Sequence, residues 1–287
     1  MSVNLHIGII GHGFVGKAVE FGFDTPEVDQ YLVDPNYGTT VASMFNNFDP
    51  HIVFIAVPTP MSDDGTINSS IIEQVFLDLS KADSKPIAVI KSTITPEVIA
   101  KIKEVYPRVI YNPEFLTERN ANHDFVNAPM LIIGGENESD MRFIKSAYDT
   151  YSKCVPCETF FVDLEAASMI KYTLNCFMAT KVLFFNQINS IFKASGTETD
   201  WNDFVSIIKA DPRVGDSHMS VPGPDGRYGY GGACFPKDTT ALVKYSKNIG
   251  VPFTALEEVV KANQKIRSQY TDLDAREKEQ NVSFNAL

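Results

Sequence analysis

Residues 5–16, Leu-His-Ile-Gly-Ile-Ile-Gly-His-Gly-Phe-Val-Gly, decide the fold of this chain. The apolar, β-branched start predicts a buried strand, and the glycines that follow predict a tight turn into a helix. Gly11 makes the turn, Gly13 lets a pyrophosphate reach the helix N-terminus, and Gly16 allows the helix to pack closely on the strand. Asp34 ends the next predicted strand, where it can accept hydrogen bonds from both ribose hydroxyls and repel a 2′-phosphate. The pattern therefore predicts a dinucleotide site that favours NAD over NADP.

Short β-branched runs alternate with helical stretches from this turn onward, which is typical of a parallel sheet covered on both faces. The strands that we expect are Leu5–Ile10, Gln30–Val33, His51–Val57, Pro86–Lys91, Arg108–Tyr111, Met130–Ile133 and Thr159–Val162. The helices that we expect lie near residues 14–23, 69–82, 96–105 and 138–151. Residues 1–163 are thus predicted to form a Rossmann-like, doubly wound α/β domain whose ligands bind beyond the carboxyl ends of the strands.

A different pattern begins at Leu164, where a long apolar helix is predicted to run to Ala194 before Gly196. A helix that is apolar on most sides needs more cover than one small domain provides, so we expect it to bridge two domains and meet a second subunit. Helices near 199–210, after Cys234 and near 254–269 complete a small helical domain, residues 164–270. Residues 271–287 are polar and are expected to fray.

The composition indicates a globular protein rather than a nucleic-acid or membrane-surface protein, because the net charge is −11. The sequence has no apolar run of membrane-spanning length and no signal-peptide pattern at its start, so we expect a cytoplasmic protein. Its 4 cysteines suggest no disulfide framework, and the Cys154-x-x-Cys157 pair has no second pair that would complete a zinc site. We expect no metal centre.

A second glycine turn, Gly229-Tyr-Gly-Gly-Ala-Cys-Phe-Pro-Lys-Asp238, sets a cysteine directly before a predicted helix. Pro236 suits the first turn of that helix, which is expected to continue to Lys247 and stop at Gly250. The amides and positive dipole at a helix N-terminus favour a thiolate, and Lys237 acts in the same direction. Cys234 is therefore a candidate nucleophile, with a buried structural cysteine as the alternative.

Three polar segments end predicted strands: Val57-Pro-Thr-Pro60, Lys91-Ser-Thr-Ile-Thr-Pro96 and Asn112-Pro-Glu-Phe-Leu-Thr-Glu118. Thr59 and Thr93 are either ligand contacts or turn residues, and Thr95 before Pro96 is an N-cap. Glu114 and Glu118 would share a helical face if their loop coils; otherwise they are solvated carboxylates.

On the long helix, Lys171 and Asn175 lie one turn apart and therefore on one face. Polar groups among apolar neighbours need partners. For Lys171 the alternative is that the side chain reaches out to solvent.

Taken in order, these segments resemble the UDP-glucose/GDP-mannose dehydrogenase family. The resemblance rests on GHGFVG, VPTP, KSTIT, NPEFLTER, IKYTLNCFMATKVLFFNQI, DPRVG and GYGGACFPKD. It implies an NAD-dependent, four-electron oxidation of the C6 alcohol of a nucleotide sugar to the acid, with UDP-glucose as the expected substrate and UDP-glucuronate as the product. It also implies a homodimer built on the long helix.

The resemblance assigns roles residue by residue. Cys234 would capture the aldehyde as a thiohemiacetal that becomes a thioester, and Lys171 and Asn175 would stabilise the oxyanion. Asp238 with Thr93 would position water or transfer protons, while Glu118, with Glu114 alongside, would assist hydrolysis. The cofactor residues would be Gly11, Gly13, Phe14, Val15, Gly16, Asp34, Val57, Pro58, Thr59, Thr93 and Lys237. The substrate residues would be Phe115, Leu116, Lys171, Asn175, Tyr230, Gly231 and Arg213, the last reaching the site of the partner subunit.

The family pattern includes a third, nucleotide-binding domain that would begin near Asn263-Gln-Lys-Ile-Arg267, and this sequence ends soon after. Residues 221–226 also lengthen the loop before Cys234. We therefore expect a compact form, with GDP-mannose or a UDP-N-acetylhexosamine as alternative substrates. A non-catalytic NAD-binding dimerisation partner is an alternative of another class. A single-step hydroxyacid dehydrogenase would use the helix lysine but would not need Cys234.

Overall fold

The computed structural model describes residues 4–284. The chain divides into two compact units, Met1–Thr59 with Asn68–Lys171 and Pro60–Ile67 with Tyr172–Leu287. The sequence predicts a domain boundary at residue 163, before the long helix, whereas the compact units divide within that helix. The two units are therefore described separately.

The first unit is built on a seven-stranded sheet in the order β2-β1-β3-β4-β5-β6-β7. Its strands are β1 (Leu5–Ile10), β2 (Val28–Val33), β3 (Ile52–Ile55), β4 (Ile87–Ile90), β5 (Val109–Tyr111), β6 (Met130–Gly135) and β7 (Glu158–Val162). Neighbouring strands pair in parallel except β5 and β6, which are antiparallel. The doubly wound fold is confirmed, and the expectation of a purely parallel sheet is wrong at this one pair. The six-residue helix between β5 and β6 is too short to carry the chain back along the sheet.

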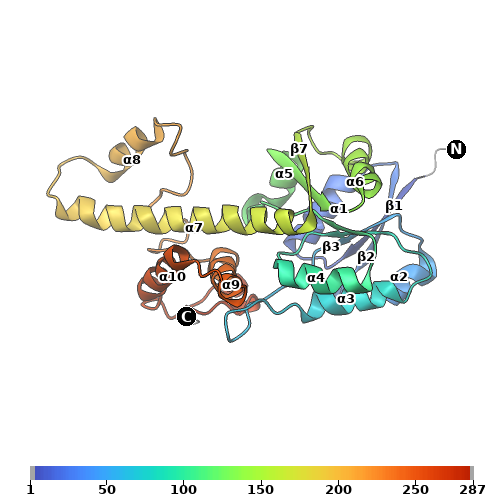
Figure 1. The fold of residues 1–287 in the computed structure, drawn as a ribbon. Coiled ribbons are helices and arrows are strands. Elements are labelled where there is room, and N and C mark those ends of the chain that lie inside the picture. The colour runs from blue at the N-terminus through green and yellow to red at the C-terminus, as the bar shows by residue number, and fades with distance from the viewer. Residues whose placement is uncertain (1–3, 285–287) are drawn as a thin grey trace. The chain divides into compact units, whose positions relative to one another are not determined.

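Helices pack on both faces of this sheet (Figure 1). They are α1 (Phe14–Phe23), α2 (Val41–Asn47), α3 (Ser70–Ser80), α4 (Pro96–Val105), α5 (Ala121–Val126) and α6 (Glu138–Tyr151). The predictions of α1, α3, α4 and α6 are confirmed. The sequence analysis missed α2 and α5, because seven and six residues are too few to show a helical period. A capping box between Thr40 and Ser43 starts α2 and was the available signal.

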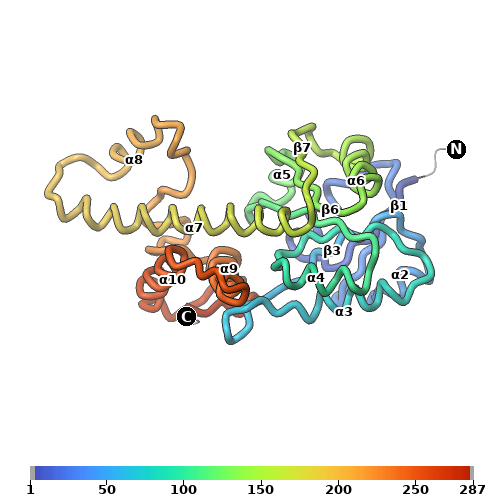
Figure 2. The backbone as a smooth tube through the Cα atoms, viewed as in Figure 1, coloured from blue at the N-terminus to red at the C-terminus, as the bar shows by residue number. Residues whose placement is uncertain are grey.

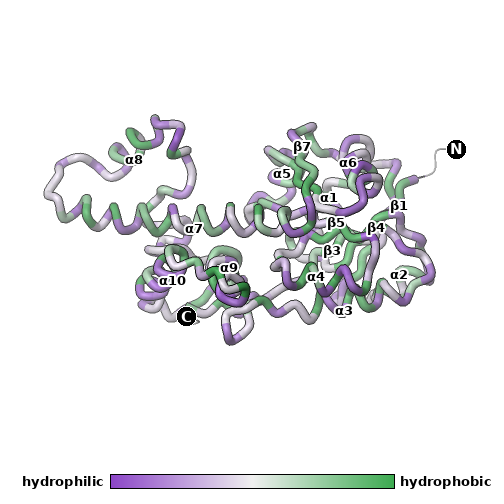
Figure 3. The backbone as a smooth tube through the Cα atoms, viewed as in Figure 1, coloured by the Kyte–Doolittle hydropathy of each residue, from purple (hydrophilic) through white to green (hydrophobic). Residues whose placement is uncertain are grey.

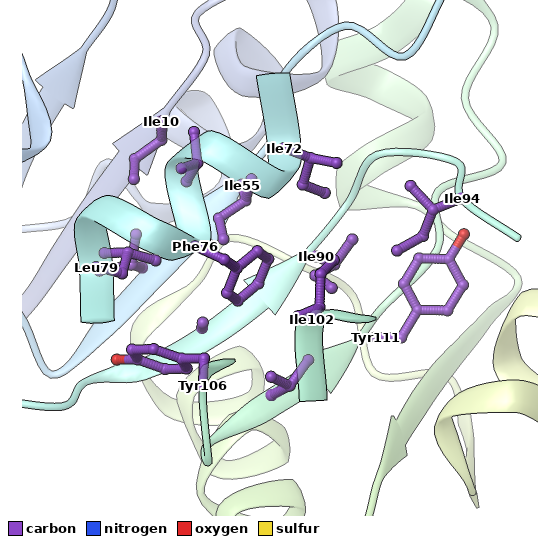
Figure 4. Close-up of a cluster of buried hydrophobic side chains, with 14 of the residues drawn as sticks. Ile10, Ile55, Ile72, Phe76, Leu79, Ile90, Ile94, Ile102, Tyr106 and Tyr111 are labelled. Atoms are coloured by element: carbon purple, nitrogen blue, oxygen red, sulfur yellow. The ribbon is translucent and has the colours of Figure 1, made fainter. Parts of the chain in front are cut away.

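Alternate residues of the central strands enter two separate hydrophobic clusters. In β3, Ile52 and Phe54 join the cluster with α1, α5 and α6, while Val53 and Ile55 join the cluster with α2, α3 and α4. Figure 4 shows part of the second cluster, where Phe76 and Tyr106 meet edge to face with ring centroids 5.7 Å apart. Because both faces are buried, these strands are apolar throughout, as the hydropathy colouring of β3 to β5 shows (Figure 3).

The second unit is helical. The long helix α7 runs over Leu164–Ala194, as predicted, and is followed by α8 (Trp201–Lys209), α9 (Phe235–Asn248), α10 (Thr254–Arg267) and α11 (Ala275–Glu279). The backbone trace shows α9 and α10 side by side (Figure 2). The side chains of Ala179, Leu183 and Tyr230 are buried with residues of α9 and α10 around them.

The expectation that residues 271–287 fray is wrong for the part that the structure describes. Asp274 and Glu277 form a capping box that starts α11, and Val282 and Phe284 are buried. The polar composition gave no sign of this order, because the segment is fixed by hydrogen bonds to distant loops rather than by its own periodicity.

Between residues 4 and 284, no helix has the length and apolar character that a membrane crossing requires.

Candidate active site

The turn between β1 and α1 has the shape that a dinucleotide requires. Gly11 has φ +87°, and a Cβ there would lie 2.6 Å from the Ala56 carbonyl oxygen. A Cβ on Gly16 would lie 2.0 Å from the Gly11 carbonyl oxygen, whereas a Cβ on Gly13 would meet nothing within 4 Å. Two glycines are thus needed for packing within the protein, and the third leaves open space at the N-terminus of α1. Phe14 and Val15, the other predicted cofactor residues of this turn, open the helix and are half-buried.

Asp34 stands at the end of β2, beside this turn. Its carboxylate accepts hydrogen bonds from the backbone N–H of His12 at 2.8 Å and of Asn36 at 2.9 Å. Burial opposes ionisation of Asp34, but these hydrogen bonds and the nearby His12 ring outweigh it and lower its pKa. The group is therefore an anion at neutral pH, so the residues present suit an NAD ribose and disfavour a 2′-phosphate.

The loops that follow β3 and β4 are joined by hydrogen bonds. The Thr59 hydroxyl donates to the Thr93 carbonyl oxygen at 2.9 Å. The Ser92 hydroxyl donates to the Val57 carbonyl oxygen at 2.7 Å. Thr59 is buried and Pro58 is exposed. The structure thus brings the predicted residues of these two loops together, at the carboxyl edge of the sheet where ligands of this fold bind.

Lys171, at the start of α7, is buried rather than extended to solvent. Its ammonium donates to the backbone carbonyl of Glu114 and lies 3.2 Å from the Glu114 carboxylate. It also lies over the Phe115 ring, 5.1 Å from the centroid. The other Glu114 oxygen accepts from the Leu116 N–H at 2.7 Å. Within the first unit, four predicted site residues therefore form one contact network in which a buried cation is paired with a buried anion.

Glu118 does not share a helical face with Glu114. Residues 113–117 are not helical, and the short 3₁₀ turn begins only at Glu118. Glu114 is buried whereas Glu118 is exposed. The proline after Asn112 disfavours a helical start there, so the shared-face alternative is wrong.

Sequence reasoning missed a second buried lysine, Lys91, at the end of β4. Its ammonium donates to Asn112 Oδ1 at 2.9 Å, and the Tyr148 hydroxyl donates to the same oxygen at 2.7 Å. Burial lowers the pKa of Lys91 to about 8, although the nearby Glu114 acts in the opposite direction. Lys91 and Glu114 border a cavity of about 320 Å³. The available signal was a lysine directly after an apolar strand. At such a position the sequence pattern alone suggests an exposed side chain.

In the second unit, Cys234 occupies the N-cap position of α9, so the predicted helix start is confirmed. One turn into α9, the buried Asp238 carboxylate accepts from Asn175 Nδ2 at 2.6 Å and from Lys237 Nζ at 2.7 Å. Asp238 is only 1% exposed. A carboxylate with that little solvent contact requires such donors. Three predicted residues, Asn175, Lys237 and Asp238, thus meet directly within this unit.

The glycine turn before Cys234 is fixed by side chains that the sequence analysis did not select. Asn263 accepts from the Tyr230 N–H at 2.8 Å and donates to its carbonyl at 2.9 Å. Asn186 Oδ1 accepts from the Gly229 N–H at 2.9 Å, and the Arg267 guanidinium donates to the Gly229 carbonyl at 3.0 Å. Asn263 and Arg267 lie four residues apart on a buried helix face, which was the available signal.

Arg213 is exposed, and its guanidinium donates to the Asp211 carboxylate rather than to another predicted site residue. The sequence assigns Arg213 to the site of a partner subunit, which stays a prediction.

Cys154 and Cys157 are free thiols, and burial raises the pKa of each. Over residues 4–284, no group of three His, Cys, Asp or Glu side chains could hold a metal ion.

Models of two parts of one family match the chain. The NAD binding domain of the UDP-glucose/GDP-mannose dehydrogenase family matches residues 36–152, and the central domain of that family matches residues 165–265. The chain is 32% identical over 231 residues to UDP-glucose 6-dehydrogenase TuaD of Bacillus subtilis, covering 77% of this chain and 48% of the relative. It is 33% identical over 227 residues to UDP-glucose 6-dehydrogenase of Rickettsia bellii, covering 77% and 50%. The chain thus spans about half the length of these curated relatives.

Solved structures share the fold. A UDP-glucose dehydrogenase from Pyrobaculum islandicum superposes with a TM-score of 0.77 at 24% identity, over 92% of this chain and 69% of that one. A 3-hydroxyisobutyrate dehydrogenase from Mycobacterium tuberculosis superposes with a TM-score of 0.68 at 16% identity, over 94% and 96%. At these identities the likeness shows the fold alone, and that fold serves more than one dehydrogenase.

The sequence matches and the glycine turn beside Asp34 lead to one assignment: the chain belongs to the UDP-glucose/GDP-mannose dehydrogenase family, and its first unit is an NAD-binding domain.

Proposed function

We propose that this chain carries out the NAD-dependent oxidation of a nucleotide sugar at C6 to the acid, with UDP-glucose as the substrate and a thioester on Cys234. The observation that supports the thioester route best is the start of α9. There a cysteine occupies the N-cap, and Asp238 one turn along is buried with Asn175 and Lys237 as donors. A single-step dehydrogenase has no need of a nucleophilic thiol at this position.

The reaction has four stages. The C6 alcohol first loses a hydride and a proton and becomes an aldehyde. The Cys234 sulfur then adds to C6, forming a C–S bond and a thiohemiacetal, and loss of a second hydride and a proton leaves a thioester. Water attacks the thioester carbonyl, the C–S bond breaks, the thiol returns, and the acid is released. NAD supplies the hydride acceptor at each oxidation. Donors fixed in advance suit the oxyanion stages, and we assign this role to Asn175 and Lys171.

The proposed roles of the carboxylates follow from their surroundings. Asp238 is held by two donors and is suited to orienting water or relaying a proton. Glu114 is paired with Lys171 and is suited to keeping that lysine in place. Glu118, which is exposed, is the proposed base for thioester hydrolysis.

The stoichiometry of NADH formation tests the proposal. With limiting UDP-glucose we expect two NADH per sugar consumed, measured by absorbance at a wavelength specific to NADH, and a UDP-glucuronate product identified by mass spectrometry. One NADH with accumulating aldehyde would eliminate the thioester route. NAD binding without NADH from UDP-glucose, GDP-mannose or UDP-N-acetylhexosamines would favour the non-catalytic dimerisation partner.

Cys234→Ser provides the matched variant, because it changes one atom of the side chain. We expect acid production to fall by at least about 10³-fold, since a hydroxyl at this position is far less ionised than a thiol. NAD affinity, measured by calorimetry, should stay within about twofold of the wild-type value. Acid formation at the wild-type rate would rule out the role of Cys234.

We also propose a homodimer through α7. Three large apolar side chains, Phe177, Phe184 and Ile191, are 59%, 57% and 64% exposed and follow one another at intervals of seven residues. Residues spaced by seven form one stripe along a helix, and a stripe of this kind is typical of a helix that packs on another. Phe184→Glu should convert the dimer to a monomer in analytical ultracentrifugation, whereas Lys193→Glu near the end of the same helix should leave the dimer intact.

A further inference from the structure

Residues 270–284, here named the strap, form hydrogen bonds with the loop of the second unit that leads to Cys234. The Tyr270 hydroxyl accepts from the Tyr228 N–H at 3.1 Å. Asp272 accepts from the Arg227 guanidinium through its carbonyl at 2.8 Å and its carboxylate at 2.6 Å. Glu277 Oε1 accepts from the Gly232 N–H at 2.9 Å. Tyr270, Asp272 and Glu277 of the strap thus contact Tyr228, Arg227 and Gly232 of the loop that leads to Cys234.

The contact at Gly232 is the one closest in sequence to Cys234. Gly232 has φ +77°, a conformation that glycine adopts without strain but does not hold by itself. Glu277 is 2% exposed, and its second oxygen accepts from the Asp274 N–H at 3.0 Å. A buried carboxylate that accepts two backbone N–H groups is a strong and directional anchor. Glu277 therefore fixes the peptide that precedes Ala233 and Cys234.

The strap also contacts a second loop of the same unit. The Gln280 carbonyl accepts from the Met61 N–H at 2.9 Å, and Asn281 Nδ2 donates to the Met61 carbonyl at 2.8 Å. Met61 pairs with Ile67 in an isolated bridge, and it directly follows the segment Val57–Pro60, whose first three residues are predicted to bind the cofactor. One short segment thus holds both the loop after the cofactor segment and the turn before the thiol.

The family match to the central domain covers residues 165–265, so the strap lies outside the matched region. We propose that the strap holds the turn in the conformation that places Cys234 at the N-terminus of α9, with Glu277 as the positioning residue. This inference rests on the proposed function, because it gives Cys234 a reaction to perform. Glu277 acts through Gly232 and has no contact with substrate in this role.

The chain supplies a matched pair of variants on α11. Glu277→Ala removes the buried anchor, whereas Glu279→Ala removes an exposed carboxylate that pairs with Arg276 on the same helix. Both variants lose one negative charge. Glu277→Gln keeps the side-chain volume and one acceptor oxygen, so it retains one of the two contacts with backbone N–H groups and should restore part of the function.

The first measurement is steady-state turnover with UDP-glucose. Losing a hydrogen bond to a buried charged group should lower kcat about 10- to 100-fold in Glu277→Ala, with KM for NAD unchanged. Glu277→Gln should give an intermediate kcat, and Glu279→Ala should match the wild type. A purely structural role would instead lower the active fraction, leaving the kcat of the folded molecules unchanged.

The second measurement needs no substrate. Cys234 is alkylated with iodoacetamide, and its modification is followed by mass spectrometry of the peptide that contains it. We expect the rate to fall by about threefold or more in Glu277→Ala, because the thiol leaves the helix N-terminus, and to stay unchanged in Glu279→Ala. Equal kcat and equal alkylation rates in the two alanine variants would overturn the proposal.

The two measurements also separate this proposal from the proposed function. If the wild type oxidises no nucleotide sugar, the proposed function fails and the alkylation rates alone decide whether the strap positions Cys234. If the wild type yields two NADH per sugar while Glu277→Ala behaves as the wild type, only the strap proposal fails.

Discussion

The glycine turn of the NAD-binding domain and the glycine turn before Cys234 are built in different ways. The turn at Gly11–Gly16 is held mainly by backbone hydrogen bonds: Gly11 N–H donates to the Val33 carbonyl, and Ala56 N–H donates to the Ile10 carbonyl. No side chain caps α1, and the Asp34 carboxylate adds a side-chain contact by accepting from the His12 N–H. The turn at Gly229–Gly232 is held by side chains of Asn186, Asn263, Arg267 and Glu277, which come from three different helices.

The difference matches what each turn has to do. A pyrophosphate binds to backbone N–H groups, so the first turn needs only the correct backbone path and an absence of side chains. A thiol must be placed against a reacting carbon, and that demands a turn whose position is fixed from outside. Substitutions in the first turn should therefore affect NAD binding, and those in the second should affect turnover.

The largest effect is expected for Gly16→Ala. Its Cβ would lie 2.0 Å from the Gly11 carbonyl oxygen, so the backbone must shift, and NAD affinity should fall by about 100-fold or more. Calorimetry measures the affinity and thermal unfolding measures the stability. Gly13→Ala is the control: its Cβ meets no protein atom within 4 Å, so it should weaken NAD binding without lowering Tm. Equal loss of Tm in both variants would contradict the packing role of Gly16.

The next effect is expected for Asn263→Leu. It leaves the N–H and the carbonyl of Tyr230 buried without their partner, which should lower the free energy of unfolding by about 2–3 kcal/mol. Denaturant unfolding measures this. Lys261→Ala on the same helix changes only exposed ion pairs and should cost less than about 1 kcal/mol. A wild-type stability for Asn263→Leu would show that the turn does not depend on this side chain.

Gly231→Ala should have a moderate effect, confined to turnover. Its Cβ would lie 2.7 Å from the Arg267 guanidinium, which is buried and must move away from the Gly229 carbonyl. We expect kcat with UDP-glucose to fall about tenfold, which corresponds to about 1.4 kcal/mol, while NAD affinity is unchanged. A loss of NAD affinity in this variant would contradict the assignment of NAD binding to the first turn and of turnover to the second.

The smallest effect is expected for Asp34→Asn. The amide keeps one acceptor oxygen for the turn but loses the charge that favours ribose hydroxyls, so NAD affinity should fall about fivefold and the preference over NADP should narrow. Parallel titrations with NAD and NADP test this. An unchanged ratio of the two affinities would show that Asp34 does not set the cofactor preference.

The same contrast explains how far the sequence could be interpreted. The glycines, the strand before them and Asp34 act within a short stretch of chain, so their spacing predicts both the sheet and the NAD site. The helix start at Cys234 is equally local, because Pro236 and the glycines before it mark the boundary. The buried Lys171–Glu114 pair and the Lys91–Asn112 bond were not predictable, because each joins residues from different strands or helices.

The sequence by itself determined the doubly wound sheet, the dinucleotide turn, the long helix and the family, because each depends on local periodicity, glycine placement or motif order. Only the tertiary structure decided which carboxylates are buried. It placed Glu114 in the interior and Glu118 on the surface, and it ordered residues 270–284 against the loop that leads to Cys234. The physical reason is that burial and hydrogen-bond partners are set by contacts between residues far apart in the chain, and no local pattern records them.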